Sequence, residues 1–272
     1  MTDTGAVRLR RLFETVRAEN RAALLPYLTV GLPDAESSVS MFEAMSEAGA
    51  DGFEIGIPYA DPLMDGPVIA EAGKRSLAGG MTIATALEIT AEVVASTGKP
   101  VLLMTYTNPV LHYGVERFAR AAADVGAAGL IIADLPIEEA DPVLAAAQDA
   151  GLGMALFAAP TTTDERLAAI AAADPSFIYA VASLGVTGER AEGSTVGQEL
   201  ASRIRSISDV PTVAGVGIST PAQAAAAATT ADGVIVGSAL VRRVLEANSP
   251  DDAANALGAA VSDLREAMVR RG

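Results

Sequence analysis

The stretch LLPYLTVGLPDAES, residues 24–37, decides between the two common ways of building a parallel sheet. Its first half, LLPYLTV (24–30), is a continuous apolar run, which is typical of a strand covered on both faces. A doubly wound open sheet would follow such a first strand with a glycine-rich phosphate-binding turn. Here GLPDAES (31–37) follows instead, and it lacks that fingerprint. The stretch therefore favours a closed barrel.

Further apolar runs of the same kind recur along the chain, and the segments between them show the 3.6-residue apolar spacing of helices. These runs are GFEIGI (52–57), VLLMTY (101–106), LIIADL (130–135), MALFAA (154–159), FIYAVAS (177–183), PTVAGVG (211–217) and GVIVGSA (233–239). Eight strand–helix units in 272 residues match a (β/α)8 TIM barrel, an α/β fold that takes about 250 residues. No linker-like stretch divides the chain, so we expect one domain over residues 1–272, with an extra amphipathic helix at the N-terminus.

Composition narrows the class of protein. The chain carries 19 basic and 34 acidic residues, a net charge of −15, which disfavours nucleic acid and anionic membrane surfaces as partners. It contains no cysteine, which excludes disulfides, zinc–thiolate sites and cysteine nucleophiles. The N-terminus lacks the apolar segment of a signal peptide, and no apolar run reaches the ~18 residues of a membrane helix. We expect a cytoplasmic protein.

The segment FEIGIPYADPLMDGP (53–67) places a glutamate inside an apolar strand and two aspartates in the loop after it. Side chains alternate along a strand, so Glu54 points away from Phe53 and into the barrel near its carboxyl-terminal end. Burial there raises the pKa of a carboxyl and suits a general acid/base. Asp61 fits a turn before proline. Asp65 fits either the N-cap of a following helix or a second catalytic carboxylate.

Two glycine-containing turns indicate phosphate binding. AGVGIS (214–219) and VGSAL (236–240) each place glycine after a strand and before a helix, where backbone N–H groups can approach an anion. Each glycine could instead only close a tight turn, but phosphate sites after strands seven and eight are frequent in such barrels. The polar segment SLGVTGERAEGS (183–194) is either a surface loop or a lid over a ligand.

Several kinds of aldolase are disfavoured by the residues that the chain lacks. A Schiff-base enzyme needs a lysine inside the barrel, whereas Lys74 lies in a helical stretch and Lys99 precedes the third strand. A metal enzyme needs several ligands, and His112 is the one histidine, which we interpret as structural. Carbon–carbon chemistry would therefore use carboxylates and an electron sink carried by the substrate, with no metal.

The motifs above resemble the tryptophan synthase α subunit family. FEIGIPYADPLMDGP carries the strongest similarity, and PYLTVGLPD, LMTYTNP, IIADLP, SLGVTG, GVGIS and VGSA follow the order of that family along nearly the whole barrel. The resemblance implies retro-aldol cleavage of indole-3-glycerol phosphate to indole and glyceraldehyde 3-phosphate in tryptophan biosynthesis. It also implies that this subunit uses no cofactor, because the protonated indole ring is the electron sink.

The resemblance also assigns roles to residues of this chain. It implies that Glu54 is the catalytic acid/base and that Asp65 holds the indole N–H, while Asp61 and Asn108 serve a subunit contact or loop order. Ala60 stands where family members often carry serine, which weakens the expectation of hydrogen bonds within that loop. The implied substrate-binding residues are Tyr27, Tyr106 and Ala133 around the indole, Tyr179 beside Glu54, Thr187 in the closing loop, and Gly188, Gly217, Gly237 and Ser238 at the phosphate.

Partners follow from the resemblance as well. It implies docking on a pyridoxal-phosphate β subunit, in a heterotetramer of two α and two β subunits with a tunnel for indole. The sequence leaves three alternatives open: a lyase that acts without a β partner, a different phosphate-handling barrel enzyme such as an isomerase, and a catalytically idle subunit that binds a phosphorylated ligand.

Overall fold

Eight parallel strands form a closed barrel in the computed structural model, which describes residues 3–181, 194–215 and 217–269. The strands follow chain order around the barrel, and β8 pairs back with β1. They are β1 (Ala23–Thr29), β2 (Phe53–Gly56), β3 (Val101–Thr105), β4 (Gly129–Ile132), β5 (Gly153–Ala158), β6 (Phe177–Val181), β7 (Thr212–Gly215) and β8 (Gly233–Val236). The predicted (β/α)8 TIM barrel is confirmed.

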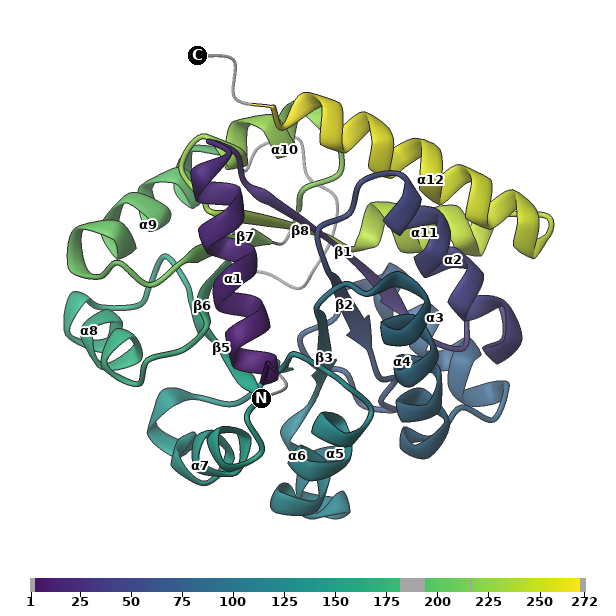
Figure 1. Cartoon of the computed structure of the whole chain (residues 1–272), viewed down its shortest axis with the longest axis horizontal. Helices are drawn as coiled ribbons and strands as arrows, with labels where there is room; N and C mark the ends of the chain where they lie inside the picture. The colour runs from purple at the N-terminus through teal and green to yellow at the C-terminus, as the bar shows by residue number, and fades with distance from the viewer. Residues whose placement is uncertain (1–2, 182–193, 216, 270–272) are drawn as a thin grey trace.

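Helices surround the barrel as an outer ring (Figure 1). They are α2 (Ala35–Glu47), α3 (Pro67–Ala78), α4 (Ile83–Thr97), α5 (Thr107–Tyr113), α6 (Val115–Asp124), α7 (Asp141–Asp149), α8 (Asp164–Ala172), α9 (Ser194–Ile207), α10 (Pro221–Ala228), α11 (Ser238–Glu246) and α12 (Pro250–Ala267), with a 3-10 turn η1 at Ile137–Glu139. Among the described residues no single helix is long and apolar enough to cross a membrane; α3 and α4 meet that criterion only as a pair bent by 106°.

The N-terminal helix α1 (Gly5–Ala18) lies across one end of the barrel, as the purple helix in the centre of Figure 1. Its side chains Leu9, Phe13 and Val16 are buried, and it contacts β1, β4 and β5. A groove of ≈ 830 Å³ runs beside it, lined by α1, α7 and the segments that lead into β6 and β7. This is the amino-terminal end of the strands, where residues of such barrels serve stability.

Strand alternation places Glu54 inside the barrel, as the sequence predicts. The ring of Phe53 packs against Phe42 of α2, with 5.2 Å between ring centroids, so Phe53 faces the helices. Glu54 points the opposite way and is paired in register with Tyr27 on β1 and Leu102 on β3. The inward-facing side chains of neighbouring strands therefore meet at this height.

The last strand is shorter than the sequence predicts. The run GVIVGSA indicates a strand over 233–239, but β8 ends at Val236 and α11 begins at Ser238. Gly237 between them has φ −115° and ψ −80°, which ends the extended backbone, so the apolar residues that follow continue as a helix. The end of the sixth predicted strand, residues 182–183, lies outside the described residues.

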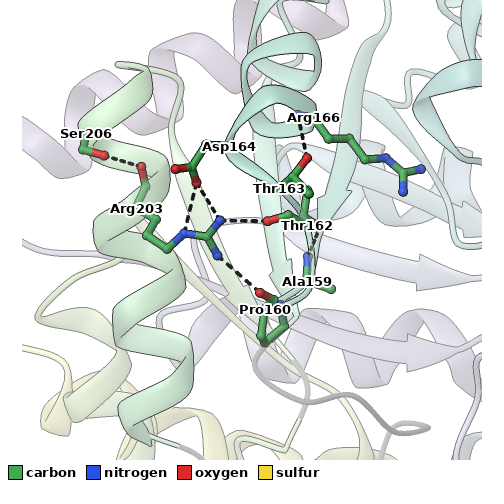
Figure 2. A network of polar contacts seen from close by, with 8 residues as sticks. All are labelled: Ala159, Pro160, Thr162, Thr163, Asp164, Arg166, Arg203 and Ser206. Atoms are coloured by element: carbon green, nitrogen blue, oxygen red, sulfur yellow. Dashed lines mark hydrogen bonds and ion pairs between the residues drawn. The ribbon is translucent and has the colours of Figure 1, made fainter.

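An arginine of α9 holds the loop between β5 and α8 (Figure 2). Arg203 donates to the carbonyl oxygens of Pro160 and Thr162 at 3.3 and 2.8 Å, and to Asp164 Oδ1 at 2.7 Å. Thr163 caps α8 in the same loop by accepting from the backbone N–H of Arg166. One side chain thus ties together the carboxyl-terminal end of β5 and the helix on the neighbouring unit.

A charged cluster fastens β1 to the start of β2. Asp51 Oδ2 accepts from Arg21 Nη1 at 2.8 Å and from the backbone N–H of Leu24 at 2.9 Å. The side chains of Arg21 and Asp51 are only 14% and 10% exposed. Replacing Asp51 by Ala is expected to lower the free energy of unfolding by about 2 kcal/mol, because the partly buried guanidinium of Arg21 loses one of its acceptors and the backbone N–H of Leu24 loses its side-chain acceptor.

Urea unfolding at neutral pH measures this difference. The matched control is Glu71→Ala on α3, whose pair with Arg75 is largely exposed and contributes little. Equal midpoints for the Asp51→Ala variant and the parent would contradict the prediction.

Candidate active site

The Glu54 carboxyl is buried and lacks a partner for one of its oxygens. The residue is 3% exposed, and its Oε2 atom has no hydrogen-bond partner among the described residues. Burial, together with the smaller effect of the negative charge of Asp65, raises the pKa of Glu54 to about 8. A carboxyl in this state is mostly protonated at neutral pH and can both give and take a proton.

Asp65 lies in the loop after β2 and contributes the second carboxyl. Gly66, and not Asp65, is the N-cap of α3, so the N-cap interpretation of Asp65 is wrong. Its side chain instead bonds with the hydroxyl of Tyr106. Burial raises the pKa of Asp65 more than this hydrogen bond lowers it, and the pKa is about 6. The carboxyl is therefore mostly ionised at pH 7, unlike that of Glu54. The surroundings of the two carboxyl groups thus give them different pKa values and different charges at neutral pH.

Two buried tyrosines, on β1 and β6, face the interior of the barrel. Tyr27 of β1 and Tyr179 of β6 are each 6% exposed, and burial raises the pKa of both phenols well above the ordinary value. The negative charge of Glu54 contributes to the raised pKa of both phenols. A Cβ atom at Gly56 would overlap the Tyr27 hydroxyl, and one at Gly215 would overlap that of Tyr179. These glycines make room for the hydroxyl groups at the carboxyl-terminal ends of β2 and β7.

Tyr106 and Ala133 follow β3 and β4 and complete one side of the site. Tyr106 is 2% exposed, and its hydroxyl accepts from the backbone N–H of Met64 at 3.3 Å. Ala133 is buried, and its backbone N–H donates to the Thr105 carbonyl. The sequence did not single out Asp134, which accepts from the backbone N–H and the hydroxyl of Thr107 at 2.7 and 2.9 Å and so fixes the start of α5 beside Tyr106.

The two glycine turns lie at the ends of β7 and β8. Gly217 has a φ of 83°, which favours glycine. Gly237 is the N-cap of α11, and because it has no side chain it leaves the first-turn N–H groups without a side-chain cap. Ser238 begins that helix and is 9% exposed. This is the arrangement of a helix N-terminus that binds an anion.

Some predicted residues lie elsewhere. Thr187 and Gly188, with the predicted lid over 183–194, fall almost wholly outside the described residues. His112 is exposed on α5 and Lys74 is exposed on α3. Lys99 precedes β3, at the end of the barrel away from Glu54. Within the described part of the chain no group of three or more His, Cys, Asp and Glu side chains could hold a metal ion.

The fold and this arrangement define a class. The chain is a (β/α)8 barrel with two carboxyl groups of raised pKa, one inside the barrel on β2 and one in the loop that follows this strand. Enzymes of this fold carry their active sites at the carboxyl-terminal end of the strands.

Comparison with known proteins gives the family within that class. A family model described as "Tryptophan synthase alpha chain" matches residues 13–269. The tryptophan synthase alpha chain of Mycobacterium tuberculosis is 46% identical over 241 residues, which are 89% of each chain. That of Trichodesmium erythraeum is 43% identical over 258 residues, or 94% of this chain and 97% of the relative.

Solved structures agree. A structure of Mycobacterium tuberculosis tryptophan synthase superposes with a TM-score of 0.90 at 42% identity, covering 97% of this chain and 99% of the other. Tryptophan synthase subunit alpha from Legionella pneumophila gives 0.88 at 37% identity, covering 96% and 98%. The chain belongs to the tryptophan synthase alpha chain family and is a lyase of tryptophan biosynthesis.

Proposed function

We propose that this chain cleaves indole-3-glycerol phosphate to indole and glyceraldehyde 3-phosphate by acid/base catalysis with Glu54 and Asp65. The observation that carries the proposal is the buried Glu54 carboxyl, whose Oε2 has no partner among the described residues and whose pKa is raised to about 8. A protein gains nothing in stability from such a group, since an unpaired buried polar atom is costly. A catalytic use accounts for it.

The two carboxyl groups divide the chemistry. Protonated Glu54 gives its proton to C3 of the indole ring, which turns the ring into an imine-like cation. The bond between that carbon and the side chain then breaks, and its electron pair returns to the ring and restores indole. The side-chain hydroxyl loses its proton to Glu54 and becomes the aldehyde. Asp65, which is mostly ionised at pH 7, accepts from the indole N–H and stabilises the cation.

The remaining residues hold the substrate. Backbone N–H groups at Gly217, Gly237 and Ser238 bind the phosphate, supported by the uncapped first turn of α11. The aromatic and small side chains of Tyr27, Tyr106, Ala133 and Tyr179 surround the indole. The roles of Thr187 in a closing loop and of Gly188 at the phosphate stay predictions.

A β subunit of tryptophan synthase is the proposed partner. Leu63 and Met64 in the loop after β2 and Leu111 on α5 are exposed, at 71%, 46% and 59%. Tyr59 and Asn108 join these two segments through a 2.8 Å hydrogen bond. Apolar side chains gathered beside an active site support a docking surface there, and docking would order the loop that carries Asp65.

Release of indole from indole-3-glycerol phosphate by the purified chain tests the proposal, alone and with a β subunit added. We expect slow turnover alone and a sharp increase with β. Fast turnover that β does not change would favour a lyase that acts without a partner. No indole from folded protein under either condition would overturn the proposed reaction.

Replacing Asp65 by Asn is expected to lower kcat by about 10- to 100-fold, because a charged hydrogen bond to the developing cation becomes a neutral one. Loss of the neighbouring negative charge also lowers the pKa of Glu54, so the pH profile of kcat should shift to lower pH. Glu71→Gln on α3, where the carboxylate pairs with Arg75 on the outer surface, is the control for the loss of one negative charge. An unchanged profile for Asp65→Asn would remove the carboxylate from this role.

A further inference from the structure

The ring of Tyr27 spans the distance between the two ends of the proposed site. At one end, a Cβ atom built at Gly237 would lie 3.3 Å from Cδ1 of Tyr27. At the other end, the Tyr27 hydroxyl occupies the space that a Cβ atom of Gly56 would need. Gly237 caps the helix of the proposed phosphate site, and Gly56 follows Glu54 on the same face of β2. A substrate bound at both places has to lie along this ring.

Among the described residues, the hydroxyl of Tyr27 has one hydrogen-bond partner. It shares a hydrogen bond of 3.1 Å with Oγ1 of Thr29, two residues further along β1. Both residues are buried, at 6% and 3% exposed. A phenolic hydroxyl has one donor and further acceptor capacity, so this single bond leaves it able to bond a ligand. The threonine fixes where the phenol points.

The strand register places Tyr27 beside the reacting carboxyl, because Tyr27 of β1 is paired with Glu54 of β2. The negative charges of Asp65 and Glu54 add to the effect of burial in raising the pKa of Tyr27, and Thr29 opposes it through the hydrogen bond. The phenol therefore stays protonated at any pH at which the protein works, and its hydroxyl is available as a neutral donor to a ligand.

We propose that the Tyr27 hydroxyl, held by Thr29, bonds the hydroxyl groups of the three-carbon chain that joins the indole ring to the phosphate, and so determines specificity for a hydroxylated chain. The inference rests on the proposed function and adds to it. The ring of Tyr27 packs as any aromatic residue of the site would, whereas its hydroxyl recognises a part of the substrate that indole lacks. A site built to bond a hydroxyl group discriminates against an analogue without it.

The test compares Tyr27→Phe with the parent on two ligands. The Kd for indole-3-glycerol phosphate is measured in the Glu54→Gln background, so that the substrate stays intact. The Kd for indole-3-propanol phosphate, whose chain carries no hydroxyl groups, is measured alongside. We expect Tyr27→Phe to weaken binding of the glycerol compound about 10-fold, the equivalent of one hydrogen bond, and to leave binding of the propanol compound unchanged.

Two further variants separate recognition from packing. Thr29→Val should reproduce part of the loss for the glycerol compound, and Thr29→Ser, which keeps the hydroxyl, should restore it. Tyr113→Phe is the matched control, because that ring packs against Phe118 between α5 and α6. It should bind both ligands as the parent does.

If Tyr27→Phe weakens the binding of both ligands equally, Tyr27 acts only through packing. If it weakens the binding of neither ligand, the hydroxyl does not contribute to binding. Either result overturns the inference. Both leave the proposed function standing as long as the parent chain releases indole. A parent that neither binds nor cleaves indole-3-glycerol phosphate would overturn the proposed function and this inference with it.

Discussion

Replacing Glu54 by Gln is expected to lower the rate of indole formation by about 10²–10⁴-fold, the usual loss when a general acid/base is removed. Glutamine fills nearly the same volume inside the barrel, but it cannot give or accept the proton at C3 of the indole ring. The carboxyl is buried and paired in register with Tyr27 and Leu102, and nothing in the described site offers a second group at that position.

Steady-state assays of indole release measure this effect, and binding of indole-3-propanol phosphate shows whether the site survives. For Glu54→Gln we expect a strongly lowered kcat for indole release and an unchanged Kd for indole-3-propanol phosphate. Glu71→Gln on the outer surface of α3 is the matched control and should keep the activity of the parent. Activity within a few-fold of the parent for Glu54→Gln would remove this residue from the proposed mechanism.

The same substitution is expected to stabilise the protein at alkaline pH. In the folded chain the pKa of Glu54 is about 8, against 4.5 for an ordinary glutamate, so the folded state binds more protons than the unfolded state between these values. Stability contributed by the protonated form is present below pH ~4.5 and is lost as the pH rises toward 8. At pH 8 and above, Glu54→Gln should therefore be more stable than the parent by up to about 5 kcal/mol.

Unfolding by urea at several pH values checks this expectation. The curves of the parent and the variant should meet near pH 4 and separate steadily between pH 5 and 8. Asp65, with a pKa raised to about 6, adds a slope of the same sign between pH 4 and 6 in both proteins. A constant difference across the whole range would mean that the Glu54 carboxyl titrates normally.

The barrel could be predicted from the sequence because each of its strands is a short apolar run with glycine or proline at its ends. Such runs determine their own strands through burial on both faces, and the spacing between them leaves room for one helix or two. The end of β8 could not be predicted, because the apolar residues of VGSAL fit a strand and a helix equally well. The backbone angles of Gly237 decide between the two.

The site could be predicted in part. Glu54 could be predicted because burying a carboxylate in an apolar strand is costly, which indicates a functional role. The alternation of side chains along the strand predicts that it points into the barrel. Asp65 stayed ambiguous because the sequence does not show which residue caps α3; the structure assigns that position to Gly66. The bond between Tyr27 and Thr29 was missed, although two polar side chains two residues apart on one strand always share a face.

The closure of the sheet, with β8 bonded to β1, has a consequence for assembly. Every strand of the described barrel has a neighbour on both sides, so the sheet offers no free edge onto which another chain could add a strand. A second protein can join this one only through its helices and loops. Such an interface can change its affinity by substitutions at the rim while the backbone bonding that holds the barrel together stays intact.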